Sequence, residues 1–301
     1  MTIPTGTQVV TREPVRDATG PEIAPAGAVG VVVAVPERGD GVYVVRLPDG
    51  REVTLRREQV RIHREHQPAG ALLPSPDPES LRSSIIYRCV VGSRAFGLDD
   101  ADSDTDRRGI YLPPAHLQWS LAHLPEQIEN HAAQECYWEI GKFLRLAVKA
   151  NPTILECLYT PLVEYATPLA EELRAMRDCF LSTHLYQTYN GYVLSQFRRL
   201  EHDLHTHGTM RHTHAMHLIR LLISGIGALR EGTISVRVTE YRERLLAIKR
   251  GDLSWAEVDA WRRDLHREFD MAYATSALPE QPDVLAVDAF LIRARRLMVE
   301  D

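Results

Sequence analysis

The residues best suited to chemistry lie in one short stretch, VGSRAFGLDDADSDTDRRGI at 91–110. It begins where an apolar run, IIYRCVV at 85–91, ends at Gly92 and Ser93. A glycine at the end of a buried strand lets backbone N–H groups approach an anion closely, and the Ser93 hydroxyl adds a further donor. The stretch therefore predicts a phosphate-binding turn.

Two carboxylates follow this turn at a regular spacing. Ten residues separate Ser93 from Asp104, and Asp106 comes two positions later, at the start of the expected strand Thr105–Leu112. Alternation along a strand would put both carboxylates on one face, about 6.5–7 Å apart. Such a pair suits Mg²⁺, and a phosphate-binding turn beside it is what metal-assisted nucleotidyl transfer needs. The plainer interpretation is an acidic loop that only solvates a turn.

These residues also resemble a known family. The matching strings are Gly92-Ser-Arg-Ala-x-Gly-Leu, Ser103-Asp-x-Asp-x-Arg-Gly109, Leu112-Pro-Pro114, Asn151-Pro-x-x-x-Glu156 and His214-Ala-Met-His-Leu-Ile-Arg220. They resemble the DNA polymerase β-type nucleotidyltransferase superfamily, and most closely the nucleotidyltransferases associated with bacterial and phage RNA-repair operons. The resemblance covers about residues 81–250. It implies that Gly92 and Ser93 bind the triphosphate of an NTP, and that Asp104 and Asp106 bind Mg²⁺ or Mn²⁺.

A third carboxylate is expected on a neighbouring strand, as in members of that superfamily. Glu129, in the expected short strand Glu126–Asn130, fits this position best, and we predict it as a catalytic metal ligand together with Asp104 and Asp106. Glu139 and Glu156 remain alternatives. For all three glutamates, the competing interpretation is a surface or helix-capping residue.

Three basic side chains stand out in the apolar helix expected over Met210–Glu231. His214, His217 and Arg220 lie among aliphatic residues, where polar groups need partners. We expect them to face the catalytic cleft and contact nucleotide or acceptor phosphate, and expect substitution there to weaken binding more than stability. Buried structural hydrogen bonds are the alternative. With an ordinary pKa near 6.5, a neutral His217 could also take the proton of the acceptor hydroxyl.

Other polar residues give weaker signals. Arg94 follows the phosphate-binding turn, and we predict that it binds nucleotide by neutralising triphosphate charge. Arg107 and Arg108 follow the carboxylates, and at least one should balance them. Lys142 is a lesser candidate. The histidines in His202-x-x-His205-x-His207 could bind zinc with a fourth ligand, and a polar loop between helices is the alternative interpretation.

The elements that must position these residues predict an α+β fold. Five short valine-rich strands over 7–62 favour a small SH3-like β-barrel in residues 1–66, with an RNA-binding face or a docking edge around its arginines. A proline-rich linker at 67–80 follows. We expect a mixed-sheet nucleotidyltransferase domain at 81–165, with a helix over Gln134–Ala150, and a helical subdomain at 166–301.

Composition excludes several classes of protein. The chain has 301 residues, of which 44% are hydrophobic, so wholesale disorder is excluded. Its net charge of −6 leaves no overall electrostatic footprint for nucleic acid. No apolar run is long enough to span a membrane, no secretory signal is visible, and the four cysteines lack CxxC spacing. We expect a cytoplasmic protein without a membrane partner; the oligomeric state stays open.

The sequence thus predicts a metal-dependent nucleotidyltransferase. We expect it to transfer NMP from an NTP to a hydroxyl on an RNA end, given the operon association that the resemblance implies. Transfer to a protein or small molecule, which the acidic net charge mildly favours, is one alternative. A non-catalytic nucleotide- or RNA-binding module is another.

Overall fold

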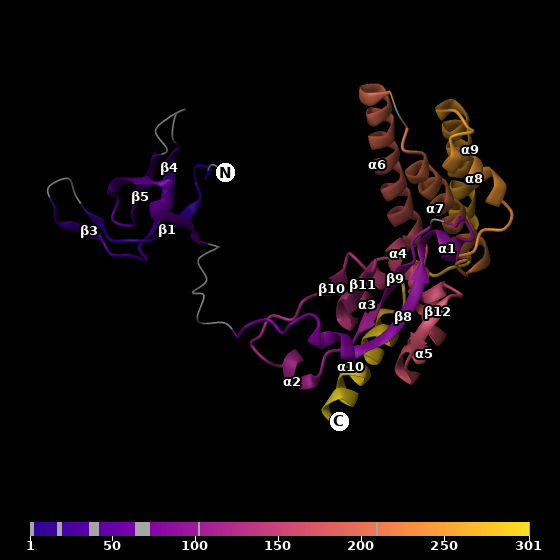
Figure 1. The fold of residues 1–301 in the computed structure, drawn as a ribbon, viewed down its shortest axis with the longest axis horizontal. Coiled ribbons are helices and arrows are strands. Elements are labelled where there is room, and N and C mark those ends of the chain that lie inside the picture. Colours follow the sequence, from indigo (N-terminus) through magenta and orange to yellow (C-terminus); the bar gives the residue numbers. More distant parts are fainter. Residues whose placement is uncertain are drawn as a thin grey trace. The chain divides into compact units, whose positions relative to one another are not determined.

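A computed structural model describes residues 3–16, 20–35, 42–63, 73–101, 103–208 and 210–300. The chain forms two compact units, Met1–Pro74 and Ser75–Asp301 (Figure 1). The predicted linker at 67–80 lies partly outside the described residues, since 64–72 are not among them.

The first unit is built on an antiparallel five-stranded sheet in the order β6-β5-β4-β1-β7. Its strands are β1 (Gln8–Thr11), β4 (Val29–Ala34), β5 (Val42–Arg46), β6 (Glu52–Arg56) and β7 (Val60–Ile62), and β2 (Val15–Arg16) pairs with β3 (Glu22–Ala24). The five strands predicted from the sequence are therefore confirmed. Within the described part of this unit, β6 and β7 do not pair, so the sheet is not closed and the SH3-like barrel is not confirmed.

The second unit contains a mixed five-stranded sheet in the order β10-β11-β9-β8-β12. Its strands are β8 (Ile85–Val91), β9 (Asp106–Tyr111), β10 (Gln127–Asn130), β11 (Glu135–Glu139) and β12 (Val163–Ala166). Strands β9 and β11 run parallel, and the other neighbours are antiparallel. As its continuous apolar run predicts, β8 is buried along nearly its whole length.

One predicted helix is wrong in its first third. Residues Glu135–Glu139 form β11, and only Ile140–Val148 are helical, as α3. Strand β11 fills the space between β9 and β10 and hydrogen-bonds to both. These non-local ladders override the helical spacing of Tyr137 with Ile140 and Phe143, which arises because a buried strand leads directly into a buried helix face.

Ten α-helices occur in the described part of the chain, all within the second unit. They are α1 (Gly92–Phe96), α2 (Ala115–Gln118), α3, α4 (Pro152–Tyr159), α5 (Pro168–Ala175), α6 (His184–His207), α7 (His212–Glu231), α8 (Arg242–Arg250), α9 (Trp255–Thr275) and α10 (Val284–Glu300). Several ends follow local chemistry. The Asn151 side chain caps α4, Ser254 and Glu257 form a capping box on α9, and Gly232 ends α7 in the left-handed conformation.

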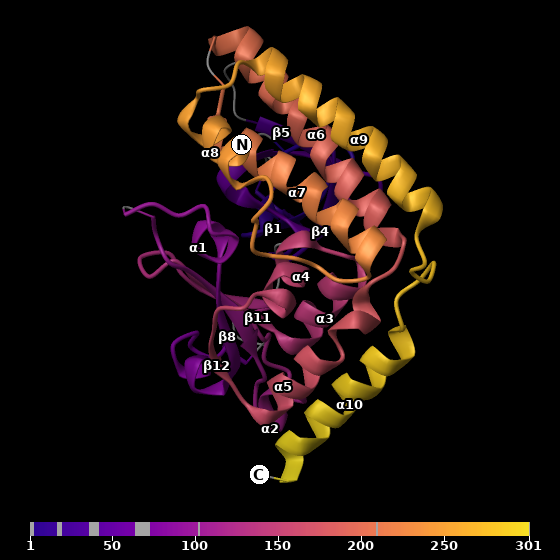
Figure 2. The same ribbon diagram turned by 90° about the vertical axis from the view of Figure 1, so that its right-hand side faces the viewer.

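The helices form two groups around the sheet. Helices α3, α4 and α5 pack on its strands, and α10 packs against α3 (Figure 2). Helices α6, α8 and α9 all pack on α7, which is the centre of the second group. One continuous apolar core joins both groups. Within the described residues, no helix is both long enough and apolar enough to cross a membrane.

Candidate active site

The predicted phosphate-binding turn and one predicted carboxylate lie directly against each other. Strand β8 ends at Val91, which pairs with Asp106 on β9. Gly92 follows with a φ of +72°, and a Cβ atom at that position would lie 2.7 Å from Asp106 Oδ2. Only glycine therefore satisfies both the backbone conformation and the close approach of the carboxylate.

Asp106 lines a cleft of about 340 Å³ between the sheet and the helices. It shares a face of β9 with Arg108 and Ile110, and Ile110 is buried under the helical layer. The cleft lies next to Asp106 and Arg108, at the end of β9 where that strand begins. Its walls come from α4, α6 and α7. The sequence-predicted residues that line it are Gly92, Asp106, Arg108, Glu156, His214, His217 and Arg220.

The other residues of the predicted turn and acidic loop lie beside this cleft. Ser93 is half-buried in the first turn of α1, and Asp104 is exposed. Arg94 donates through Nη2 to the carbonyl of Ser103 at 2.7 Å and through Nε to that of Asp104 at 3.3 Å. Arg94 was expected to bind nucleotide, but in the structure its guanidinium holds the backbone of the acidic loop. The described residues that line the cleft do not include Ser93, Arg94 or Asp104.

The two arginines after the carboxylates have different partners. Arg108 lies 3.3 Å from Asp106 Oδ1 and also donates to two backbone carbonyls. Arg107 points to the opposite face, where it forms an ion pair with Glu164 at 2.8 Å. The expectation that one of the two balances the local acids is thus confirmed for Arg108. Lys142 pairs with Glu126 at 2.6 Å and does not reach the cleft.

The glutamates considered as a third metal ligand do not join Asp106. Glu129 pairs with Cys136, which itself pairs with Arg108, so a whole strand separates Glu129 from β9. The Glu129 carboxylate accepts from Gln127 at 2.7 Å and borders a smaller cavity of about 180 Å³. Glu139 caps α3 by accepting from the backbone N–H of Lys142. Across the described ranges, no three His, Cys, Asp or Glu side chains form a group that could hold a metal.

The donor set nevertheless fits one kind of metal binding. Magnesium commonly takes one or two protein carboxylates, with substrate phosphates and water completing the shell. Asp106 beside the open Gly92 turn meets this requirement with one carboxylate for a magnesium ion that arrives with a nucleotide. Strand β9 begins only at Asp106, so the predicted placement of Asp104 and Asp106 on one face of a strand is wrong, and Asp104 lies outside the cleft lining. A cage of three protein carboxylates does not fit.

Arg220 and Glu156 form a buried ion pair in the cleft wall. Arg220 Nη2 lies 2.7 Å from Glu156 Oε1, and each side chain is only 7% exposed. The guanidinium also stacks on Phe96, with Cζ 3.6 Å from the ring centroid. Sequence reasoning treated Arg220 as a phosphate contact and Glu156 as a possible metal ligand. It missed that they neutralise each other, because no local spacing links α4 to α7.

The ion pair is not fully saturated. Among the described residues, Arg220 Nε and Glu156 Oε1 have no hydrogen-bond partner of good geometry. Both atoms are buried, so the ion pair leaves part of its own hydrogen-bonding capacity unused.

Of the three histidines of α7, His214 and His217 line the cleft, and both are half-buried. Burial, and next the charge of Arg220, lower the pKa of His217 to about 4. The ordinary pKa expected from the sequence is therefore wrong, and His217 is neutral and a weak base at pH 7. Its ring contacts Phe96 edge-on, at 6.1 Å between centroids. His214 lies 3.3 Å from Gln196 Oε1, and burial also lowers its pKa.

The expected histidine loop is part of a helix. Helix α6 continues to His207, and its residues His202 and His205 are exposed. The prediction of a polar loop at these residues is therefore wrong. The side chain of His207 lies outside the described residues, and within those residues nothing near His202 forms a metal-binding group.

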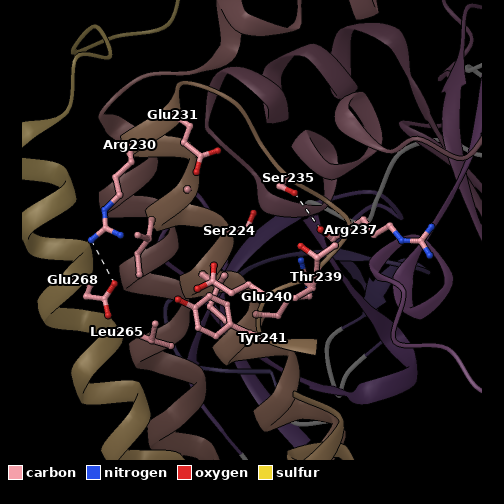
Figure 3. Close-up of a pocket in the computed structure, with 15 residues that line it drawn as sticks. Ser224, Arg230, Glu231, Ser235, Arg237, Thr239, Glu240, Tyr241, Leu265 and Glu268 are labelled. Atoms are coloured by element: carbon pink, nitrogen blue, oxygen red, sulfur yellow. Dashed lines mark hydrogen bonds and ion pairs between the residues drawn. The ribbon is translucent and has the colours of Figure 1, made fainter. Parts of the chain in front are cut away.

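A second cavity, of about 250 Å³, is shown in Figure 3, and Arg220 lines both this cavity and the cleft. It is enclosed by α7, the segment 232–241 and α9, and its charges are mixed. Arg230 pairs there with Glu268 at 3.4 Å, and two more carboxylates, Glu231 and Glu240, also line the cavity. Three arginines, Arg220, Arg230 and Arg237, line the same cavity, so its charge does not decide between the two sites. The cleft at Gly92 is the candidate for an NTP because it contains the glycine turn and Asp106.

Comparison with known families agrees with this geometry. The model of the RNA repair pathway DNA polymerase beta family, RlaP, matches residues 54–293. The chain belongs to the RlaP family. This confirms the resemblance seen in the sequence motifs, and membership of RlaP supports a nucleotidyltransferase-like role. The match begins in β6 of the first unit, earlier than the motifs alone indicated.

A curated relative matches over a shorter stretch. The chain is 39% identical over 103 residues to "Uncharacterized protein YcgL" of Bacillus subtilis (strain 168). The match covers 33% of this RlaP chain and 40% of YcgL, so it spans less than half of either protein. No solved structure shows significant similarity to the chain.

Proposed function

We propose that this RlaP protein is a nucleotidyltransferase that moves NMP from an NTP to a hydroxyl on an RNA end and releases pyrophosphate. The observation that carries the proposal is the contact between the Gly92 turn and the Asp106 carboxylate at the cleft. Membership of a polymerase β family of RNA repair supports both the reaction type and the acceptor.

The triphosphate would lie over the first turn of α1. The backbone N–H groups of Gly92 and Ser93 lack intrahelical acceptors there, because the first N–H groups of a helix have none. Arg108 adds a positive charge beside them. Asp104 and Asp106 would hold a magnesium ion together with the phosphates. When bound, that ion supplies charge neutralisation of the leaving pyrophosphate and lowers the pKa of the acceptor hydroxyl.

In the reaction, the acceptor oxygen forms a bond to the α-phosphorus and its proton passes to solvent water, while the bond from that phosphorus to the bridging oxygen of the β-phosphate breaks and pyrophosphate leaves. His217 is neutral and can orient the acceptor by a hydrogen bond. Its low pKa makes it a poor proton acceptor at pH 7. The Arg220–Glu156 pair keeps the cleft wall rigid beside the reacting groups.

The position of the label tests the proposal. The protein is incubated with Mg²⁺, a panel of RNA, protein and small-molecule acceptors, and NTPs labelled on either the α- or the γ-phosphate. The expected result is α-label on RNA and γ-label in pyrophosphate. Transfer of the γ-label would indicate phosphoryl transfer and contradict the proposal, as would the absence of transfer to every acceptor.

Neighbouring arginines give a matched pair of variants for this assay. Arg108→Ala removes the charge beside Asp106, whereas Arg107→Ala removes the same charge from the opposite face of β9. We expect transfer to fall at least about tenfold for Arg108→Ala, because charge-assisted contacts to phosphate are strong. Equal rates for the two variants would contradict this role of Arg108.

A further inference from the structure

A groove of about 540 Å³ lies beside the C-terminal half of α6 and adjoins the catalytic cleft. The two share His214, which lines both the groove and the cleft. Gln196 lies in the groove, 3.3 Å from the His214 ring. A ligand that filled the groove could therefore reach the cleft past this Gln196–His214 contact.

Helix α6 presents an ordered row of side chains along this path. Tyr192, Gln196 and Arg199 are spaced four and three residues apart, so they lie on one side of the helix. Tyr192 lines the cleft and is 46% exposed, so its ring is open to a ligand there. Arg199 lines the groove about 10 Å further along the helix. The row thus runs from an exposed aromatic ring to a positive charge.

The groove is positively charged, although the whole chain has a net charge of −6. Three arginines and one aspartate line it, and the aspartate, Asp203, already pairs with Arg211 at 3.3 Å. Arg198 and Arg199 are exposed, and neither forms an ion pair with any residue that the structure describes. Two cations are therefore available to a ligand.

We propose that this groove binds the acceptor strand of single-stranded RNA, with its phosphates on Arg198 and Arg199 and a terminal base stacked on Tyr192. The strand end then reaches the cleft past His214. Single-stranded nucleic acids are bound in this way, by a cationic groove along the backbone and by aromatic rings that stack on bases. An acidic peptide would use the arginines but not the exposed ring at the cleft. The inference rests on the proposed nucleotidyl transfer and names its acceptor.

The test measures RNA affinity apart from catalysis. Binding of a short fluorescein-labelled single-stranded RNA is followed by anisotropy over a range of KCl concentrations. The test variant is Arg198→Ala/Arg199→Ala. The control is Arg263→Ala/Arg267→Ala, which removes the same charge from exposed positions on α9. Thermal melting of each variant verifies folding.

We expect the test variant to bind the RNA at least about tenfold more weakly, and its slope of log affinity against log salt to be shallower by about 1.4, which corresponds to two lost phosphate contacts. Tyr192→Ala should weaken binding about fivefold or more and leave the salt slope unchanged. The control should match the wild-type protein in both respects.

Three results would overturn the groove assignment. One is equal affinity and slope for the test and control variants, and another is no RNA binding by the wild-type protein. Transfer of label to a protein or small molecule, at the same rate in both double variants, would also overturn it; nucleotidyl transfer would then stand, but with an acceptor other than RNA. Conversely, groove-dependent RNA binding without transfer to any acceptor would refute the proposed transfer alone.

Discussion

The Arg220–Glu156 pair allows a quantitative test of how the cleft is built. Both side chains are 7% exposed, and their charged atoms lie 2.7 Å apart. Replacing either partner leaves the other as an unpaired buried charge, which costs about 3–5 kcal/mol of the free energy of unfolding. For a unit as large as Ser75–Asp301, about 2–4 °C per kcal/mol predicts a loss of roughly 6–20 °C in melting temperature.

Three variants make the double-mutant cycle: Arg220→Met, Glu156→Leu and the combination of both. The two single variants should each melt far below the wild-type protein. The double variant should recover most of the loss, because no charge is then left unpaired and apolar replacements of buried pairs are often neutral. Urea unfolding gives the free energies, and a nucleotide titration of the same samples separates stability from binding.

Two outcomes would refute this reasoning. If each single variant lost less than about 1 kcal/mol, the pair would behave as an exposed salt bridge. If the double variant lost the sum of the two single effects, the residues would not be coupled. A large loss of nucleotide affinity without loss of stability in Arg220→Met would restore the interpretation of Arg220 as a phosphate contact.

Three further predictions concern the cleft. Gly92→Ala should lower the free energy of unfolding by about 1–2 kcal/mol and reduce transfer at least about tenfold, since its Cβ would displace the Asp106 carboxylate. The control is Gly97→Ala, where φ is +71° but a Cβ atom would make only ordinary contacts; it should lower stability by a similar amount and leave transfer unchanged. Equal turnover of the two variants would count against the close contact. The pKa of His217 is about 4, below the roughly 6.5 of an unfolded histidine, so its contribution to stability is complete above about pH 6.5 and is lost as the pH falls towards 4. His217→Asn should therefore flatten the curve of melting temperature against pH in that window, and an unchanged curve would disprove the burial effect. Glu129→Gln should retain transfer to within about tenfold, because two carboxylates suffice for a magnesium ion that arrives with the nucleotide; complete loss of transfer would make Glu129 the third ligand.

Features that depend on neighbouring residues could be predicted from the sequence. The Asn151 cap, the Ser254 capping box and the glycine that ends α7 are encoded within a few positions, and the structure has all three. The apolar run of β8 and the turn at Gly92 are local in the same sense. The sequence also allowed the proximity of the turn to Asp106 to be predicted, because two consecutive antiparallel strands bring their adjoining ends together.

Features that depend on distant residues could not be predicted. Strand β11 resembles the start of a helix until β9 and β10 are placed on either side of it. The partner of Arg220 lies on another helix, and the low pKa of His217 results from burial that no spacing reveals. The role of Arg94 was missed for the same reason, since the loop folds back so that its carbonyls meet the guanidinium.

The central claim is that Asp106 beside Gly92 supports nucleotidyl transfer, and a single-turnover measurement of α-label transfer tests it most directly. Asp106→Asn is compared with Asp99→Asn, which removes the same charge from an exposed position in the neighbouring acidic loop. We predict a loss of at least about 100-fold for Asp106→Asn, because a metal-binding carboxylate contributes several kcal/mol to transition-state stabilisation, and no significant loss for Asp99→Asn. Transfer by Asp106→Asn at a rate close to that of Asp99→Asn would contradict the account.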